Sequence, residues 1–460
     1  NTALGRSALE NNTTGSNNVA VGYQAAYSST STYVTALGYQ SAFYTTTGNI
    51  LAAGYQAGHN NTTGTGNTAV GRYRPLFTNT TGSNNTAIGD QALFSNTTAA
   101  SNTAVGYQAM YQNTTGTRNV AVGYQALENN ISNSYNTAVG YDALRENQGG
   151  TQNTAVGDSA LLNNTTGTYN TAVGQGAMVS NTTASYSTGI GLNTLYNATT
   201  ASHNTALGNR AGVNITTGYD SVFVGSNAGA STTTGFRNAY VGYQAGYLNQ
   251  TSIANVAMGY AALYSATGGG NTGIGYVSLN NTTTGQYNTA IGQNSGAGNT
   301  SGSNNTYIGY DCYGNAGTDT NSIVIGTNSH RGKGSSTGFI APAGGGVYQG
   351  NNSSSWSTTS DERLKKNIVD NDEGLNKINA IQVRNFEYRT AEEVTELDPI
   401  NTIDISGVQL GVIAQELEAI CPECVKTEST GVKSVDTDSL FWHMLNAVKD
   451  LSAKNDALEA

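Results

Sequence analysis

A strict internal repeat constrains the fold of this chain more than any other feature. The pentad Asn-Thr-Ala-Val-Gly, or a close copy, places a glycine at 20 positions from Gly5 to Gly326, and 15 of the 19 intervals equal the period of 17 that separates Gly106 from Gly123. This period is too short for a pair of helices, and the abundant Gly, Thr and Asn oppose helix formation. Residues 1–326 are therefore predicted to form a mainly β shaft, a β-solenoid or β-roll of stacked short strands.

Three columns of the repeat predict what lies inside the shaft. The residue before each repeat glycine is Val, Ile, Leu or Met except at Ala53, so we expect this aliphatic column to be the buried stack. The residue two before the glycine is usually Ala, and the residue three after it is nearly always Ala, Ser or Thr. These columns predict a narrow interior, in which Cys312 replaces Ala or Ser.

Two further columns predict contacts between successive rungs. The residue after the glycine is Tyr ten times but also Arg72 or Asp90, so this position must reach water. We expect a partly exposed tyrosine ladder that stacks from rung to rung, with the binding of sugar rings as the alternative. The recurring Asn-Thr-Thr-Gly predicts turns whose Asn side chains bond along the shaft axis.

The shaft repeats resemble the heads of trimeric autotransporter adhesins and the shafts of some phage tail fibres. That resemblance covers residues 1–326 and implies a homotrimer in which three chains pack as parallel rolls. The chain begins within the repeat pattern, so we expect a preceding part that joins the shaft to the rest of its assembly.

Charge separates a second domain from the shaft. Residues 1–359 carry 9 Lys/Arg and 9 Asp/Glu, whereas residues 360–460 carry 10 and 20. Residues 327–359 are rich in Gly and Ser and are predicted to be a neck. The absence of a basic surface argues against nucleic acid as a partner. No apolar run is long enough for a membrane span, so membrane insertion is not expected either.

The acidic domain opens on Ser-Asp-Glu-Arg-Leu-Lys-Lys at residues 360–366, a typical helix start with Ser360 or Asp361 as N-cap. Leu-Asn-Lys-Ile from residue 375, Phe-Glu-Tyr at 386–388 and Gly-Val-Ile-Ala-Gln-Glu at 411–416 follow in order. Together these motifs resemble the C-terminal intramolecular chaperone of phage tail spikes, tail fibres and endosialidases. The resemblance implies a small α+β domain over residues 360–440 that trimerises, directs folding of the shaft and then releases itself by autoproteolysis.

The same resemblance implies a single-turnover Ser-Lys peptidase and not a turnover enzyme. Ser360 would be the nucleophile and Lys365 its base, with Asp361 and Arg363 in support, and the bond adjacent to Ser360 would be cut. A lysine acts as a base only where burial or neighbouring cations lower its pKa. Positions five apart lie about 140° apart around a helix, so we expect Ser360 just before the helix, on a bent backbone. From the residues alone, the alternative is a plain helix cap.

The last residues predict the start of a trimeric coiled coil over 441–460. Apolar residues recur at spacings of three and four, with Asn455 at an a position: Phe441, Met444, Val448, Leu451 and Leu458. Since the heptads continue to the last residue, we expect more coil to follow.

Cys421-Pro422-Glu423-Cys424 is the one close cysteine pair. Its spacing suits zinc or a redox pair, but the four histidines show no paired spacing for further ligands. The alternative is that both cysteines replace apolar residues around the turn at Pro422. The sequence thus predicts no metal site and no cofactor.

These observations favour a virion tail fibre or spike shaft that attaches to a host cell-surface receptor. A bacterial surface adhesin with the same shaft and chaperone, located at the cell surface, is the alternative. A glycan hydrolase is a third class, but it needs convergent carboxylates. Asp142 and Asp158 lie in neighbouring rungs, yet their interval is one short of the full period, so we expect them to face differently.

Overall fold

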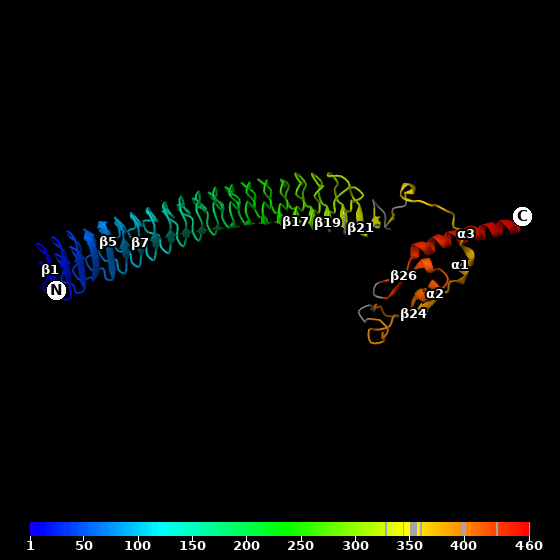
Figure 1. The fold of residues 1–460 in the computed structure, drawn as a ribbon, viewed down its shortest axis with the longest axis horizontal. Helices are drawn as coiled ribbons and strands as arrows, with labels where there is room; N and C mark the ends of the chain where they lie inside the picture. The colour runs from blue at the N-terminus through cyan, green and yellow to red at the C-terminus, as the bar shows by residue number, and fades with distance from the viewer. Residues whose placement is uncertain are drawn as a thin grey trace. The chain divides into compact units, whose positions relative to one another are not determined.

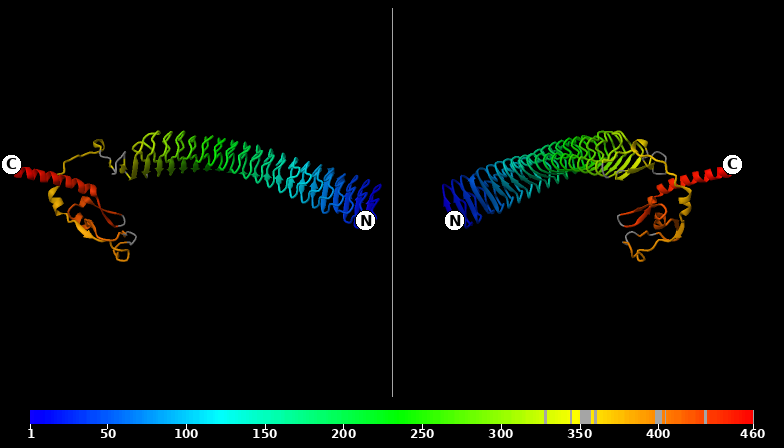
Figure 2. Two further views of the ribbon diagram at one scale, coloured as in Figure 1. Left: turned by 180° about the vertical axis from the view of Figure 1, so that it is seen from behind. Right: turned by 45° about the vertical axis from the view of Figure 1, so that its right-hand side comes forward.

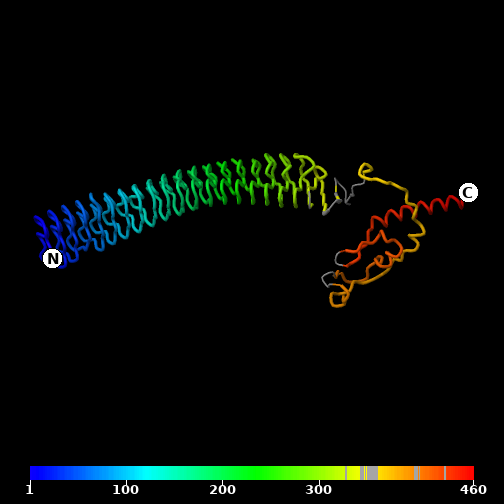
Figure 3. Tube along the Cα trace, viewed as in Figure 1, coloured from blue at the N-terminus to red at the C-terminus, as the bar shows by residue number. Residues whose placement is uncertain are grey.

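The chain forms two compact units, Asn1–Thr359 and Ser360–Ala460, in a computed structural model. The structure describes residues 1–326, 329–343, 345–349, 357–358, 361–397, 402–403, 405–428 and 431–459. The first unit is a mainly β solenoid, as predicted, and Figures 1 and 2 show its short strands stacked one above the next along the shaft. The Cα trace in Figure 3 shows the same coil repeating from rung to rung.

Nearly every repeat contributes one strand of about the same length. The strands of the first unit are β1 Thr2–Leu4, β2 Val19–Val21, β3 Val34–Leu37, β4 Ile50–Tyr55, β5 Asn67–Tyr73, β6 Thr86–Ile88, β7 Thr103–Val105, β8 Val120–Val122, β9 Thr137–Val139, β10 Thr154–Val156, β11 Thr171–Val173, β12 Thr188–Ile190, β13 Thr205–Leu207, β14 Val222–Val224, β15 Ala239–Val241, β16 Val256–Met258, β17 Thr272–Ile274, β18 Thr289–Ile291, β19 Thr306–Ile308, β20 Ile323–Gly326, β21 Gly338–Ala343, β22 Gly345–Gln349 and β23 Ser357–Thr358.

From β1 to β20 the strands pair in parallel, each with the next along the chain, and the register follows the repeat. Thr154 of β10 lies opposite Thr171 of β11, for example, which is the same position of the next repeat. The repeat glycine makes this close stacking possible. Gly106 has a φ of +140°, and a Cβ atom there would lie 2.2 Å from the carbonyl oxygen of Gly123 in the next rung. A side chain at this position would therefore push the rungs apart.

The prediction that the aliphatic residue before each glycine forms the core is wrong. Most strands are only three residues long, as in β9, and the aliphatic residue is the last of the three. Successive residues of a strand point to opposite faces, so the Ala at the centre faces inward and the aliphatic residue before the glycine faces outward. Ala138 is fully buried, whereas Val139 is only half-buried and Leu207 is 47 % exposed. No residue of the aliphatic column is fully buried in the single chain. The small column three residues after the glycine is buried as predicted, Cys312 included.

A column that the sequence analysis missed completes the core. Four residues after nine of the 20 repeat glycines the chain places a large apolar side chain that is fully buried, such as Leu127, Leu144 and Met178. Where this position is Gly, another large residue takes the space, from a strand centre in most cases and from the first residue of β4, Ile50, beside Gly58. Phe223 fills the volume beside Gly229, and Tyr240 fills it beside Gly246. The interior is therefore conserved in volume while the position of the large residue changes.

Asparagine and tyrosine ladders join the rungs, as predicted. The Oδ1 atom of Asn102 accepts a bond of 2.9 Å from the backbone N–H of Asn119, and buried Asn130 donates to Oδ1 of Asn113 at 2.9 Å. The rings of Tyr124 and Tyr141 stack with centroids 4.9 Å apart. A second stack, which the sequence analysis did not predict, joins rings that stand five or six residues after successive repeat glycines: Tyr27, Phe43, His59, Phe77, Phe94 and Tyr111.

The Asn-Thr-Thr-Gly turn forms without the left-handed backbone that Asn and Gly readily adopt. Neither Asn79 nor Gly82 of one Asn-Thr-Thr-Gly copy has a positive φ; the left-handed residues lie elsewhere, such as Asn84 with a φ of +59°. Instead Asn79 donates to the carbonyl oxygen of Gly82 at 2.9 Å and closes the turn. A Cβ atom at Gly82 would lie 2.2 Å from the carbonyl oxygen of Ala99, so close stacking requires this glycine as well.

The sheet continues past the last repeat glycine. Strand β21 pairs in parallel with β20, and its Phe339 is buried. Strands β22 and β23 then pair in antiparallel fashion, which ends the solenoid stacking. Residues 327, 328, 344, 350–356 and 359 lie outside the described residues, so the neck predicted over 327–359 is not described in full.

The second unit is small and α+β. Its elements are η1 Glu362–Leu364, α1 Leu375–Ala380, β24 Arg384–Phe386, β25 Gln409–Gly411, α2 Ala414–Glu418, η3 Pro422–Cys424, β26 Val425–Thr427, β27 Lys433–Val435 and α3 Thr437–Glu459. Strands β24 and β25 form one antiparallel pair, and β26 and β27 form another. Among the described residues, no helix is long and apolar enough to cross a membrane.

Helix α3 has two different stripes with the same spacing. His443 and Ala447 are buried against the rest of the second unit, and Asp450 accepts a bond of 2.9 Å from the backbone N–H of Leu375. The predicted coiled-coil residues lie on another stripe, where Met444 and Val448 are 51 % and 64 % exposed. One stripe therefore holds the unit together, while the apolar seam has no cover within the described part of the chain.

Candidate functional site

The segment predicted to contain the cleavage site passes from extended backbone at Asp361 into the short helix η1. The Asp361 carboxylate caps η1 by accepting a bond of 2.9 Å from the backbone N–H of Arg363. The guanidinium of Arg363 also donates to it at 3.0 Å, which holds the pKa of Asp361 below its usual range. Asp361 and Arg363 therefore act as one unit that fixes the start of η1.

Lys365 lies directly after η1 and not within a longer helix. Its φ of −113° and ψ of 152° are extended, so the helix expected to continue past this residue ends at Leu364. Lys365 and Lys366 are both exposed in the single chain. Ser360, the predicted nucleophile, lies outside the described residues, so its place relative to Lys365 stays a prediction.

Sequence reasoning missed a charged cluster that holds α3 to the segment before α1. Nε2 of His443 lies 2.8 Å from Oε1 of Glu423, and its Nδ1 lies 2.9 Å from the backbone carbonyl oxygen of Glu373. The ammonium of Lys377 donates to Glu423 at 2.6 Å and to the carboxylate of Glu373. The hydrogen bond from Lys377 lowers the pKa of Glu423 to about 2. These residues lie far apart in the sequence, so only the tertiary fold reveals the cluster.

The two cysteines of the Cys-Pro-Glu-Cys turn are joined by a disulfide. Cys421 precedes η3 and Cys424 ends it, and both side chains are fully buried beside Leu417. The pair therefore occupies an apolar position around Pro422, and it is also chemically linked. Cys421, Cys424 and His443 each offer one metal-ligating atom, and these atoms lie within 4.8 Å of one another.

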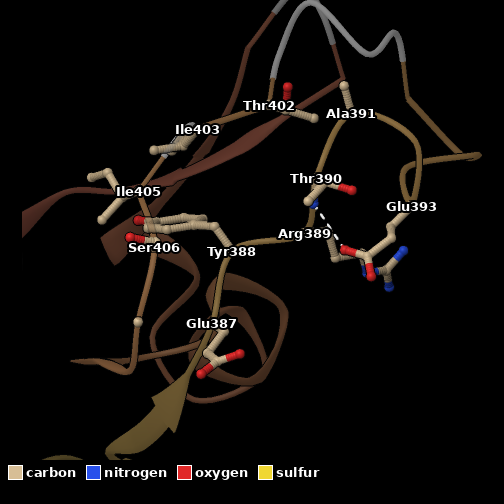
Figure 4. Close-up of a pocket in the computed structure, with 11 residues that line it drawn as sticks. Glu387, Tyr388, Arg389, Thr390, Ala391, Glu393, Thr402, Ile403, Ile405 and Ser406 are labelled. Carbon is tan, nitrogen blue, oxygen red and sulfur yellow. Dashed lines mark hydrogen bonds between the residues drawn. The ribbon is translucent and has the colours of Figure 1, made fainter.

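A polar hollow of about 590 Å³ opens beside strand β24 in the second unit. Figure 4 shows its lining, which comes from residues 387–393 and from 402, 403 and 405–407. Its charged groups bond within the chain: Glu393 accepts from the backbone N–H of Thr390 at 2.9 Å, and Arg389 pairs with Glu396 at 3.1 Å. The hollow brings none of the predicted cleavage residues together.

On the shaft, Asp142, one of the two carboxylates considered for glycan hydrolysis, lies in a cluster around Arg145. Arg145 contacts Asp142 at 3.2 Å, Glu146 at 3.0 Å and Glu128 at 3.7 Å. Burial raises the pKa of Asp142 and of Glu128, although Arg145 opposes both shifts. Asp158 bonds to the hydroxyl of Ser159 at 2.6 Å. Asp142 is thus held in an ion-pair cluster that Asp158 does not join.

A second hollow, of about 790 Å³, opens where the tyrosine ladder is interrupted. Between Tyr141 and Tyr243 the residue after each repeat glycine is never Tyr. The hollow is lined there by aromatic, amide and charged side chains that include Tyr196, Gln175, Asn193, Asp158 and Arg210. Such a lining can offer both an aromatic face and several hydrogen bonds to one ligand.

Comparison with known families identifies the second unit. Residues 360–426 match the family Peptidase_S74, described as the chaperone of endosialidase. Comparisons with curated proteins and with solved structures found no match. The match confirms the resemblance predicted from the motifs, and the structure confirms that a repeat shaft precedes this domain.

Proposed function

We propose that this chain forms the shaft and chaperone of a trimeric phage tail fibre, which attaches the virion to a host cell surface. The premise is the match of residues 360–426 to the chaperone of endosialidase, directly after a β-solenoid shaft. In this proposal the chaperone aligns three chains, the shafts fold against one another, and the chaperone is then cut away.

The outward aliphatic column supports three identical chains. It presents Val, Ile, Leu or Met once per rung along nearly the whole shaft, and several of these side chains are about 40 % exposed or more. A long apolar stripe on a free surface marks an interface. Only a partner with the same rung spacing can cover this stripe over its full length, and a second copy in parallel has that spacing. The exposed apolar seam of α3 likewise supports association with further copies of the same chain.

Self-cleavage would proceed through Ser360 and Lys365. The neutral amine of Lys365 takes the hydroxyl proton of Ser360, whose Oγ attacks the carbonyl carbon of an adjacent peptide bond. The C–N bond breaks, the leaving amine receives the proton, and water then hydrolyses the ester to a carboxylate. Burial favours the neutral amine, and Lys365 is exposed in the single chain. We therefore place the activation of Lys365 in the assembled trimer.

Host attachment would use the interrupted stretch of the shaft. The hollow around Tyr196 combines an aromatic ring with amide and charged groups, which suits a hydroxyl-rich ligand such as a surface glycan. Elsewhere in the ladder, tyrosine rings stack on each other along this column. A bacterial surface adhesin with the same shaft remains the alternative, and it shares every feature except the virion.

Denaturing gels of the freshly expressed chain, with and without heating, test the proposal. We expect a trimer that resists the detergent until it is heated, together with a released fragment of about 100 residues, the length that follows residue 359. A single full-length monomer band in both lanes would contradict both the trimer and the cleavage. Binding of the trimer to host cells, compared with phage-resistant cells, then separates a tail fibre from an adhesin.

A further inference from the structure

We propose that the Cys-Pro-Glu-Cys turn and helix α3 form a zinc site once the disulfide is reduced, with Cys421, Cys424 and His443 as ligands. One ligand atom from each residue lies within 4.8 Å of the other two. Both cysteines are fully buried and His443 is 6 % exposed. Three ligands of this kind therefore already converge on one point inside the second unit.

The donor set is the one that zinc prefers. Thiolate sulfur and imidazole nitrogen bind Zn²⁺ in tetrahedral sites, where neighbouring ligand atoms lie about 3 to 4 Å apart. A two-residue spacer lets both cysteines of one turn reach the same ion, and here their Cα atoms are 5.3 Å apart. The observed separations need only small side-chain movements to meet this geometry.

The surroundings of His443 point to a cation independently of the cysteines. The carbonyl oxygen of Glu373 can only accept a hydrogen bond, so Nδ1 of His443, 2.9 Å away, carries the hydrogen. In a neutral ring, Nε2 then has a lone pair, and it faces the carboxylate of Glu423 at 2.8 Å. A proton on Nε2 completes an ion pair with Glu423, which the ammonium of Lys377 also contacts, and a metal ion at this nitrogen would replace that proton.

The same contacts match the support that zinc-bound histidines receive. A ligating histidine generally donates its other ring N–H to a carbonyl or a carboxylate, which fixes the orientation of the ring. The Glu373 carbonyl supplies this bond, and Glu423 is the carboxylate that faces the ligating nitrogen. Glu423 and Glu373 form a separate group with His443, so the ligands of the proposed site are Cys421, Cys424 and His443.

Disulfide and zinc exclude each other. A thiol reductant delivers two electrons to the disulfide, which yields two cysteine thiols and the oxidised reductant. Binding of one Zn²⁺ then releases the two thiol protons and leaves two metal-bound thiolates. Glu423 of η3 already contacts His443 of α3, and the zinc state would add a metal bridge from Cys421 and Cys424 to the same helix. The ion would thereby tie the exposed helix to the body of the second unit.

Cobalt is the probe for this site, because tetrahedral thiolate sites give Co²⁺ a visible spectrum. The full chain is reduced with dithiothreitol, separated from the reductant under anaerobic conditions and titrated with Co²⁺. A second reduced sample is loaded with Zn²⁺, and its bound Zn²⁺ is measured by elemental analysis. We expect one equivalent per chain with a thiolate-to-metal charge-transfer band. The same chain left oxidised should bind none at this site, a comparison that needs no substitution.

Three variants assign the ligands. Cys424→Ser should abolish the charge-transfer band of the reduced chain, and His443→Gln should weaken binding about tenfold or more. Cys312→Ser is the matched control, because it removes the buried cysteine of the shaft and should leave the titration unchanged. Absence of binding to the reduced chain, or equal binding by Cys421→Ser/Cys424→Ser, would overturn the proposal and leave a proton between His443 and Glu423.

Discussion

Interior volume in the shaft is divided between two residues, and the division changes along the chain. In the rung of β9 the strand centre is Ala138 and the large residue is Leu144, whereas β14 carries Phe223 and the large residue is replaced by Gly229. Both Leu144 and Gly229 have left-handed backbones, with φ of +53° and +59°. The two arrangements share the same backbone conformation at this position, so substitutions can convert one arrangement into the other without a change of backbone.

This exchange predicts strong coupling between Phe223 and Gly229. Phe223→Ala leaves a cavity and should cost about 3 to 5 kcal/mol of unfolding free energy. Gly229→Leu should also destabilise, because a Cβ atom there lies 2.4 Å from two ring carbons of Phe223. The double variant recreates the pattern of β9 and should recover on the order of 2 kcal/mol relative to the sum of the two single changes. Chemical denaturation of the four chains measures this coupling, and additive losses would contradict it.

Self-cleavage makes a prediction at single residues. Ser360→Ala and Lys365→Ala should each abolish release of the C-terminal fragment, whereas Lys366→Ala, which removes an equally exposed neighbouring charge, should leave most of it. Because the reaction is intramolecular, its rate should not depend on protein concentration once trimers exist.

Mass and N-terminal sequence of the fragment check this prediction, with Ser360 or Asp361 expected as its first residue. A different first residue, or cleavage that persists in Ser360→Ala, would leave Ser360 without a role in the cut. Denatured chain should stay whole.

Among the elements, each short strand has one inward and two outward positions. In β9, Ala138→Asp places a carboxylate in the fully buried column, so the shaft should fail to fold. Val139→Asp lies on the half-buried outer face, so it should spare the fold of one chain. In the proposed trimer it brings three carboxylates together and should weaken association of the chains. Light scattering and thermal unfolding separate the two effects. A Val139→Asp trimer as stable as the unchanged protein would show that this stripe is not the interface.

Helix α3 offers the same comparison in the second unit. Leu451→Glu introduces charge into the exposed apolar seam and should weaken association of the chaperone units. Ala453→Glu introduces the same side chain at an exposed site away from this seam and should have little effect. Sedimentation velocity of the two variants would decide, and equal association of both would argue against a coiled coil.

The repeat predicted the strands, their parallel stacking and the asparagine and tyrosine ladders, because these depend on contacts between equivalent positions of neighbouring repeats. The repeat did not predict whether the residue at the strand centre or the aliphatic residue after it faces inward. A strand of three residues is too short to show an alternating pattern of apolar and polar residues. The cluster of His443 with Cys421 and Cys424 was missed for another reason. Its members meet only after α3 folds back onto η3, and no local spacing records that contact.

For the whole molecule, nearly identical rungs would leave the alignment of the chains in the proposed trimer undetermined during folding. A shift by one rung keeps every aliphatic side chain in an equivalent place, so nothing along the shaft strongly opposes it. Alignment must then be set from an end, and the chaperone unit follows the last rung.

A chain that ends at Thr359 should therefore give aggregates or misaligned rods, as judged by electron microscopy and light scattering. The control is the full chain with a protease site after Thr359, cut only after folding, and its shaft should stay intact. Normal trimers from the shortened chain would contradict a role for the chaperone unit in alignment.

Because each repeat stacks one strand, the length of the shaft is proportional to the number of repeats. Each repeat adds one strand spacing of about 4.8 Å. Its strand pairs with the equivalent strands of the repeats before and after it, as β10 pairs with β11. Loss or duplication of a whole repeat therefore changes the reach of the molecule by a fixed step without creating a new surface. Unequal recombination between such repeats could lengthen or shorten the shaft while the structure at either end stays as it is.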